Sequence, residues 1–168
     1  MTNPGTLPAC SRPRLFGLSS VTMIHPAPTN KIDPKLARGV LEEVLPATAT
    51  KPAYAVVSFP NTSYRVHLEP IGEITTQPGK TIMGTIHARA KRIDTCTTGG
   101  RFIDPVFGRP RRVQGSIVAI EDEHIVVSTG VPVHCLPTDP RQKASDFEVG
   151  QFVSMGVEAG ASFEEVQV

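Results

Sequence analysis

The clearest structural signal in the chain is the run IMGTIHARAK at residues 82–91. Ile82 and every second residue after it are apolar or small, and most residues between them are polar or charged. Side chains of a β-strand point alternately to opposite faces of a sheet, so this period of two predicts a strand with one buried face. The small residues Gly84, Ala88 and Ala90 on that face favour a tightly curved sheet or a close contact.

Further strands are predicted on both sides of this run. Short apolar or alternating segments between Pro- and Gly-rich turns predict strands at residues 53–59, 64–69, 113–120, 124–129, 131–136 and 152–158. The polar turn at 121–123 joins two of these strands into a hairpin. Pro132 and Pro137 mark 131–136 as an edge strand, because proline cannot donate to a neighbouring strand.

One helix is predicted, at residues 34–45. Asp33 fits its N-cap, Pro34 fits its first position, and Pro46 ends it. Its apolar residues recur at helical spacing: Leu36, Ala37, Val40, Leu41, Val44 and Leu45. A helix this short is marginal alone, so we expect its apolar stripe to pack on the sheet. A helix that binds a partner is the alternative.

The order of these elements over about residues 80–160 resembles the OB-fold in architecture. The chain is therefore predicted to be mainly β, with a small antiparallel OB-like barrel of about five to seven strands and one short N-terminal helix. A β-sandwich or a hot-dog-like fold is the alternative. In this interpretation, residues 31–160 form a single domain and residues 161–168 an acidic C-terminal tail. Residues 1–30 contain five prolines and no periodic apolar face, so we expect them to be disordered. Both Met1 and Met23 fit as the start of the protein.

Charge is distributed unevenly along the chain, although the net charge is only +1. Residues 89–112 contain seven basic and two acidic residues, whereas residues 113–168 contain two basic and nine acidic ones. The total charge therefore gives no general attraction to nucleic acid or to acidic membranes, but the 89–112 segment alone is strongly basic.

This basic segment is the predicted binding site. Its middle is a loop of about sixteen residues, longer than most hairpin connections. Basic side chains contact phosphates and phenylalanine rings stack on bases in proteins that bind single-stranded nucleic acid. The candidate nucleic-acid-binding residues are Arg89, Lys91, Arg92, Arg101, Phe102, Phe107, Arg109, Arg111 and Arg112.

Two functions remain open at this point. The first is a non-enzymatic OB-like module that binds single-stranded nucleic acid through the basic loop. The second is a structural or protein-interaction subunit that self-associates, its basic loop meeting the acidic C-terminal surface of the same chain or of another copy. A basic loop that is merely solvated is the third interpretation.

The sequence favours a role other than catalysis. Its histidines and cysteines lack HxxxH, HxH and CxxC spacing, and the adjacent His134 and Cys135 would point to opposite faces of a strand. Cys96 and His87 are a conceivable Cys–His pair, but nothing marks Cys96 as activated. We therefore expect no catalytic residue, metal or cofactor. Three cysteines without a pairing pattern, and the lack of a long apolar run, predict a cytoplasmic protein that does not enter the membrane.

Overall fold

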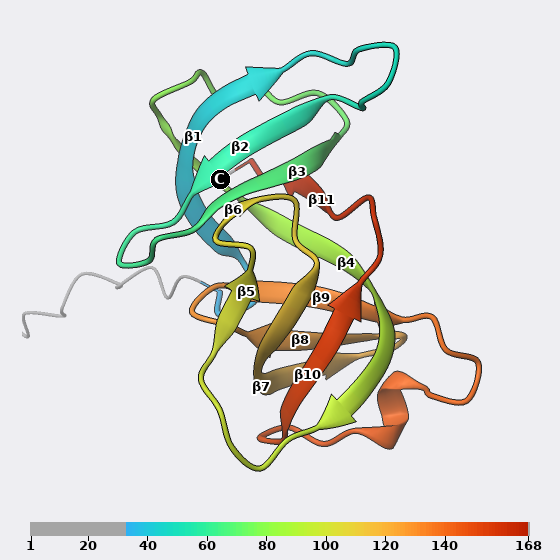
Figure 1. Cartoon of the computed structure of the whole chain (residues 1–168). Coiled ribbons are helices and arrows are strands. Elements are labelled where there is room, and N and C mark those ends of the chain that lie inside the picture. Colours follow the sequence, from blue (N-terminus) through green and yellow to red (C-terminus); the bar gives the residue numbers. More distant parts are fainter. Residues whose placement is uncertain (1–32, 168) are drawn as a thin grey trace, which may run out of the picture. The chain divides into compact units, whose positions relative to one another are not determined.

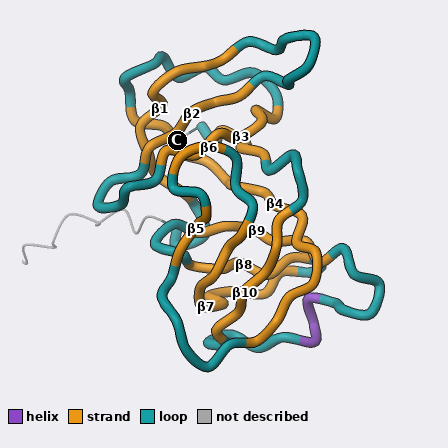
Figure 2. Tube along the Cα trace, viewed as in Figure 1, coloured by secondary structure: helices purple, strands orange, loops and turns teal. Residues whose placement is uncertain are grey.

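The computed structural model of the chain describes residues 33–167, which are almost entirely β (Figures 1 and 2). This part of the chain contains eleven strands and one short 3-10 helix: β1 (Ala37–Leu45), β2 (Tyr54–Ser58), β3 (Arg65–Ile71), β4 (Thr81–Thr95), β5 (Phe102–Asp104), β6 (Phe107–Gly108), β7 (Arg112–Glu121), β8 (His124–Ser128), β9 (Pro132–Pro137), η1 (Ala144–Asp146), β10 (Phe152–Val157) and β11 (Ser162–Glu165). The prediction of a mainly β chain is confirmed. The expected disorder of residues 1–30 lies outside the described residues. Within the described range, no helix is long and apolar enough to cross a membrane.

Backbone pairing closes nine of these eleven strands into two rings of five strands that share β4. In ring 1, strands β1, β2, β3, β11 and β4 pair in that order, and β4 pairs again with β1. In ring 2, strands β4, β10, β7, β8 and β9 pair in that order, and β9 pairs again with β4. The β3–β11 and β4–β9 pairs are parallel, so the sheet is mixed rather than antiparallel as predicted.

Strand β4 takes part in both rings because it is fifteen residues long. Its first half, residues 81–87, pairs with β1 and β11, and its second half, residues 87–95, pairs with β9 and β10. Figure 1 shows β4 running from the upper group of strands into the lower group. The strand that the alternation at residues 82–91 predicted is thus the element that joins the two rings.

Strand β1 of ring 1 and strand β7 of ring 2 each contain a glycine in close contact with the next strand along the chain, β2 or β8. A Cβ atom on Gly39 would lie 2.6 Å from the carbonyl oxygen of Ser58, and one on Gly115 would come closer still to the carbonyl oxygen of Ser128. Both β1 and β7 contain a β-bulge two residues after this glycine. The two rings therefore repeat one local geometry, in which only glycine permits the approach of the neighbouring backbone.

The same correspondence continues into the third strands. His67 of β3 pairs with Val56 of β2, and His134 of β9 pairs with Val126 of β8. β2 and β8 share one burial pattern, with three buried residues between two half-buried ones. Ring 1 and ring 2 are thus structural repeats, although their sequences differ at most positions.

Residues 34–45 do not form the predicted helix. Ala37–Leu45 is strand β1, paired with both β2 and β4. Its buried residues Ala37, Gly39 and Leu41 alternate with more exposed residues, which is the period of a strand. The carboxylate of Asp33 accepts a hydrogen bond at 2.9 Å from the backbone N–H of Lys35. The residue predicted as the N-cap of a helix therefore closes a single turn before β1. Pairing on both edges outweighs the weak intrinsic preference of these residues for a helix.

Two other expectations about strand edges and termini are wrong. The acidic C-terminal segment is not a tail throughout, because Ser162–Glu165 forms β11 between β3 and β4 and Phe163 is fully buried. The predicted edge strand at 131–136 corresponds to β9, which pairs with β8 and with β4. Its two prolines are the first and last residues of the strand, Pro132 and Pro137, where a missing N–H is tolerated.

Candidate nucleic-acid interface

The second half of β4 carries three of the predicted basic residues. Arg89 and Lys91 alternate with buried alanines, so both side chains point out of ring 2. The Nε atom of Arg89 lies 3.4 Å from a carboxylate oxygen of Glu158, and the Nε atom of Arg92 lies 2.9 Å from one of Asp94. Both ion pairs are solvent-exposed and therefore weak.

Arg112 is anchored between two neighbouring strands at the start of β7. Its Nε and Nη2 atoms donate hydrogen bonds of 3.3 and 3.2 Å to the hydroxyl oxygen of Ser154 on β10. Its guanidinium carbon lies 5.9 Å from the centre of the Phe102 ring on β5, within the range of a cation–π contact. The pairing of β7 with both β5 and β10 brings these three residues together.

Strand β10 forms a path with small side chains between two strands that carry long basic ones. Phe152, Ser154 and Gly156 are the residues of β10 that alternate with the core residues Val153, Met155 and Val157, and Ser154 is only 5% exposed. A Cβ atom on Gly156 would lie 3.6 Å from Cδ of Lys91 on β4, and Gly156 pairs with Arg112 on β7. The basic side chains of Lys91 and Arg112 therefore lie over the small residues Gly156 and Ser154 of β10.

The loop between β4 and β5 is held against the outer face of β7. Nη2 of Arg101 donates a hydrogen bond of 3.3 Å to the hydroxyl oxygen of Ser116. The side-chain amide of Gln114 donates one of 3.0 Å to the carbonyl oxygen of Gly100. The long loop of the prediction is thus tethered by polar contacts, and β5 and β6 lie in its second half.

The remaining predicted residues lie around β6 and the turn into β7. Arg111 is fixed through its backbone, because its N–H donates to the carbonyl oxygen of Asp104 and its own carbonyl oxygen accepts from Val157, both at 2.8 Å. Arg109 is exposed. Phe107 is 61% exposed and lies on ring 1, where β6 pairs with β3. The structure therefore brings Lys91 and Arg112 together at β10, with Phe102 beside Arg112. Phe107 lies elsewhere, next to β3 of ring 1.

Most of the positive charge of this segment has no carboxylate partner. Among residues 33–167, only Arg89 and Arg92 of the segment form ion pairs. The basic residues that form none in this range are Lys91, Arg101, Arg109, Arg111 and Arg112. Two acidic residues near the C-terminus have other partners: Glu164 lies 3.3 Å from His87, and Glu165 accepts a 2.7 Å hydrogen bond from the backbone of Thr75.

Three residues outside the prediction contribute to this surface. Ser154 anchors Arg112, Gly156 leaves room for the side chain of Lys91, and Arg141 lines a shallow pocket with Arg92 and Asp139. Hydrogen bonds from Arg141 lower the pKa of Asp139 to about 2, so the carboxylate is ionised at neutral pH. The glycine inside the strand pattern FVSMGV was the one available signal, because an isolated glycine in a strand marks a close approach.

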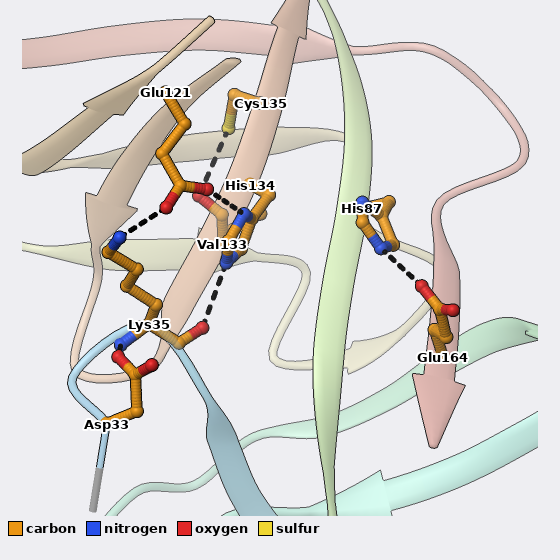
Figure 3. A network of polar contacts seen from close by, with 8 residues as sticks. All are labelled: Asp33, Lys35, His87, Glu121, Val133, His134, Cys135 and Glu164. Atoms are coloured by element: carbon orange, nitrogen blue, oxygen red, sulfur yellow. Dashed lines mark hydrogen bonds and ion pairs between the residues drawn. The ribbon is translucent and has the colours of Figure 1, made fainter. Parts of the chain in front are cut away.

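A second polar cluster lies on β4 and β9. The ring centres of His87 and His134 are 5.7 Å apart, and those of His87 and His124 are 6.3 Å apart. Nε2 of His134 donates a 2.9 Å hydrogen bond to the carbonyl oxygen of Lys35, whose ammonium group pairs with Glu121 (Figure 3). Within the described residues, no group of three His, Cys, Asp or Glu side chains is arranged to hold a metal ion.

Cys135 is the neighbour of His134 but faces the opposite side of β9. Its side chain is fully buried in the core, and burial raises the pKa of its thiol to about 12. The thiol is therefore protonated and inaccessible at neutral pH, which makes it a core residue rather than a nucleophile. The two adjacent residues point apart, as the alternation of a strand requires.

No protein-family model, curated protein or solved structure matches this chain.

Proposed function

We propose that the chain is a non-enzymatic binding module that holds single-stranded nucleic acid on the outer surface of ring 2. In this proposal, ring 2 is an OB-like unit, because five strands pair in a closed order with a single parallel neighbour pair. OB-folds are five-stranded and bind oligonucleotides on strand faces and the adjoining loops.

The observation that carries the proposal is the pair of basic side chains, Lys91 and Arg112, that lie over Gly156 and Ser154 of β10 and form no ion pair within residues 33–167. Proteins bind single-stranded nucleic acid where cations follow its phosphate backbone. Lys91 and Arg112 supply such cations, and Arg111 lies next to Arg112. Phe102, half-buried under the guanidinium of Arg112, offers an aromatic ring at the same place.

The positions of the reactive side chains support a role other than catalysis. Cys96 follows the last residue of β4, nine positions after His87. His87 pairs with Ser162 and His134, whereas the backbone N–H of Cys96 donates to the carbonyl oxygen of Phe152, so the two side chains lie at different places in the sheet and do not form a Cys–His pair. Within the described residues, the one hydrogen bond of the Cys96 thiol is donated to the carbonyl oxygen of Asp94, at 3.8 Å.

The proposal is tested by fluorescence anisotropy with labelled single-stranded DNA and RNA oligonucleotides at low salt. Wild-type protein should bind, and the double substitution Arg111→Ala, Arg112→Ala should weaken binding on the order of tenfold or more, because two phosphate contacts are lost. A matched control is Arg38→Ala, Lys80→Ala, which removes the same charge from exposed positions on ring 1. The control should bind nearly as tightly as wild type.

Self-association through the basic segment gives the opposite pattern. The purified protein would then bind no oligonucleotide at any salt concentration. The Arg111→Ala, Arg112→Ala protein would instead show a changed mass in light scattering, because the basic surface would be a contact between copies. That combination of results would replace the nucleic-acid proposal with the oligomer.

A further inference from the structure

Three aromatic rings from three strands lie side by side on the outer face of ring 1. The ring centres of Tyr54 on β2 and His67 on β3 are 5.9 Å apart, with the planes inclined by 47°. The ring centres of His67 and Phe107 on β6 are 5.2 Å apart, with the planes inclined by 74°. We call these three residues the aromatic strip. Contacts at these distances hold aromatic rings in defined orientations.

Phe107 is the exposed member of the strip, and Tyr54 and His67 are half-buried. Phe107 is fixed by the pairing of β6 with β3, where the backbone N–H of Arg65 donates to the carbonyl oxygen of Val106 at 2.7 Å. Its ring is nevertheless 61% exposed, and the residue before it, Val106, is 51% exposed. A large aromatic side chain that is held in place and left exposed is typical of a binding surface.

The equivalent face of ring 2 is covered. His134 occupies there the position that His67 occupies in ring 1, and His124 corresponds to Tyr54. In ring 2 the chain around Lys35 crosses this face, its carbonyl oxygen bonded to His134, which is only 8% exposed. The histidine at this position is therefore buried in ring 2 but half-buried in ring 1, where the exposed ring of Phe107 lies beside it.

The charges around the strip suit a ligand with flat rings and a negative backbone. Arg65 lies opposite Phe107 in the β3–β6 pair, and Arg109 follows Phe107 by two residues. Arg65 is 3.5 Å from Glu42, a pair with a strongly exposed arginine that leaves its guanidinium accessible. Phe107 also belongs to the same chain segment as Phe102 and is at most about 18 Å from it.

We infer that the aromatic strip of Tyr54, His67 and Phe107 stacks on the bases of the single-stranded nucleic acid whose phosphates bind the basic surface. This inference rests on the proposed function and adds a second contact region on ring 1. Base stacking on exposed aromatic rings tolerates any sequence, because every base has a flat face.

The test uses the fact that the chain contains no tryptophan. The substitution Phe107→Trp places a single indole in the strip, where its fluorescence reports stacking. Two labelled ligands are compared: a single-stranded oligothymidylate and an abasic oligonucleotide with the same number of phosphates. The oligothymidylate should quench the indole and bind the Phe107→Trp protein about as tightly as wild type. The abasic ligand should leave the indole fluorescence unchanged.

Substitutions that remove a ring of the aromatic strip measure how much that ring contributes to oligonucleotide affinity. Phe107→Ala and His67→Ala should each weaken oligothymidylate binding roughly 5- to 150-fold and leave abasic binding and the salt dependence unchanged. The matched control is Val149→Ala, another exposed apolar residue, with 62% exposure, which should bind as wild type does.

The failures of the two proposals are distinguishable. If wild-type protein binds oligothymidylate but Phe107→Ala binds it equally well, the strip does not contact bases and only this inference falls. The same conclusion holds if Phe107→Ala weakens abasic binding to the same extent. If wild-type protein binds neither ligand, the proposed function falls and this inference with it.

Discussion

The hydroxyl group of Tyr64 connects three parts of the chain that are distant in sequence. It donates a hydrogen bond of 3.1 Å to the carbonyl oxygen of Thr129, which follows β8, and accepts one of 3.2 Å from the backbone N–H of Ile103 on β5. Tyr64 itself precedes β3 and is buried. One side chain of ring 1 thereby satisfies two buried backbone groups of ring 2 and of the strand that carries Phe102.

We predict that Tyr64→Phe lowers the free energy of unfolding by about 1–3 kcal/mol, because it leaves a buried N–H and a buried carbonyl without a partner. Urea denaturation of wild type and variant measures this difference. Tyr54→Phe is the matched control: no hydrogen bond of its hydroxyl group is found within residues 33–167, and it should change stability by less than about 0.5 kcal/mol. Equal effects of the two substitutions would contradict the role given to Tyr64.

The histidine cluster predicts a pH dependence of stability. Burial lowers the pKa of His87 from its usual 6.5, and the nearby His134 and His124 add to this, although the hydrogen bond with Glu164 opposes it. The unfolded chain keeps the ordinary pKa, so it binds more protons than the folded chain as the pH falls below about 6.5. The free energy of unfolding should therefore decrease between about pH 7 and pH 5.

His87→Gln removes this titration and should flatten the pH dependence in that interval. Urea denaturation at several pH values measures both proteins. A variant that loses as much stability as wild type on acidification would show that His87 is not the group responsible.

At the scale of single elements, the sequence predicted most of the strands but assigned β1 to a helix. Ala37 and Leu41 are four residues apart, a spacing that fits both a helix and the buried face of a strand. Strand β11 is only four residues long and half acidic, so it has no pattern to find. In contrast, β4 and the β7–β8 hairpin have uninterrupted patterns and lie where they were predicted.

The candidate site was predictable only in its residue types. The sequence of residues 89–112 shows its basic charge and its two phenylalanines, of which Phe107 is exposed and Phe102 is half-buried in the structure. The contact between Arg112 and Phe102 depends on β5, a strand of three residues, and the small residues of β10 face Arg112 only through strand register. Register arises from long-range pairing, which local sequence patterns do not encode.

A pair of adjacent residues distinguishes strand β1 from the predicted helix. Leu41 is fully buried, whereas its neighbour Val40 is 36% exposed. Leu41→Ala should therefore cost about 2–5 kcal/mol, and Val40→Ala less than about 1 kcal/mol. In a helix both residues would belong to one buried stripe and both substitutions would be costly. Comparable losses in urea denaturation would contradict the strand.

At the scale of the described chain, the shared strand β4 links the two proposed contact regions. Its second half carries Lys91 of the basic surface on ring 2, and its first half closes ring 1, which carries the aromatic strip. Ring 1 and ring 2 thus carry different surfaces, an aromatic one on ring 1 and a basic one on ring 2. In this account a single strand of nucleic acid contacts both.

The salt dependence of oligonucleotide binding tests this account most directly. Each phosphate contact releases counterions, so the logarithm of the association constant should fall linearly with the logarithm of the salt concentration. For Arg111→Ala, Arg112→Ala, the line should be less steep than for wild type by about 1–2 units, at roughly 0.7–0.9 per lost contact. Equal slopes for the two proteins, or no binding by wild type at low salt, would contradict the claim that this surface binds nucleic acid.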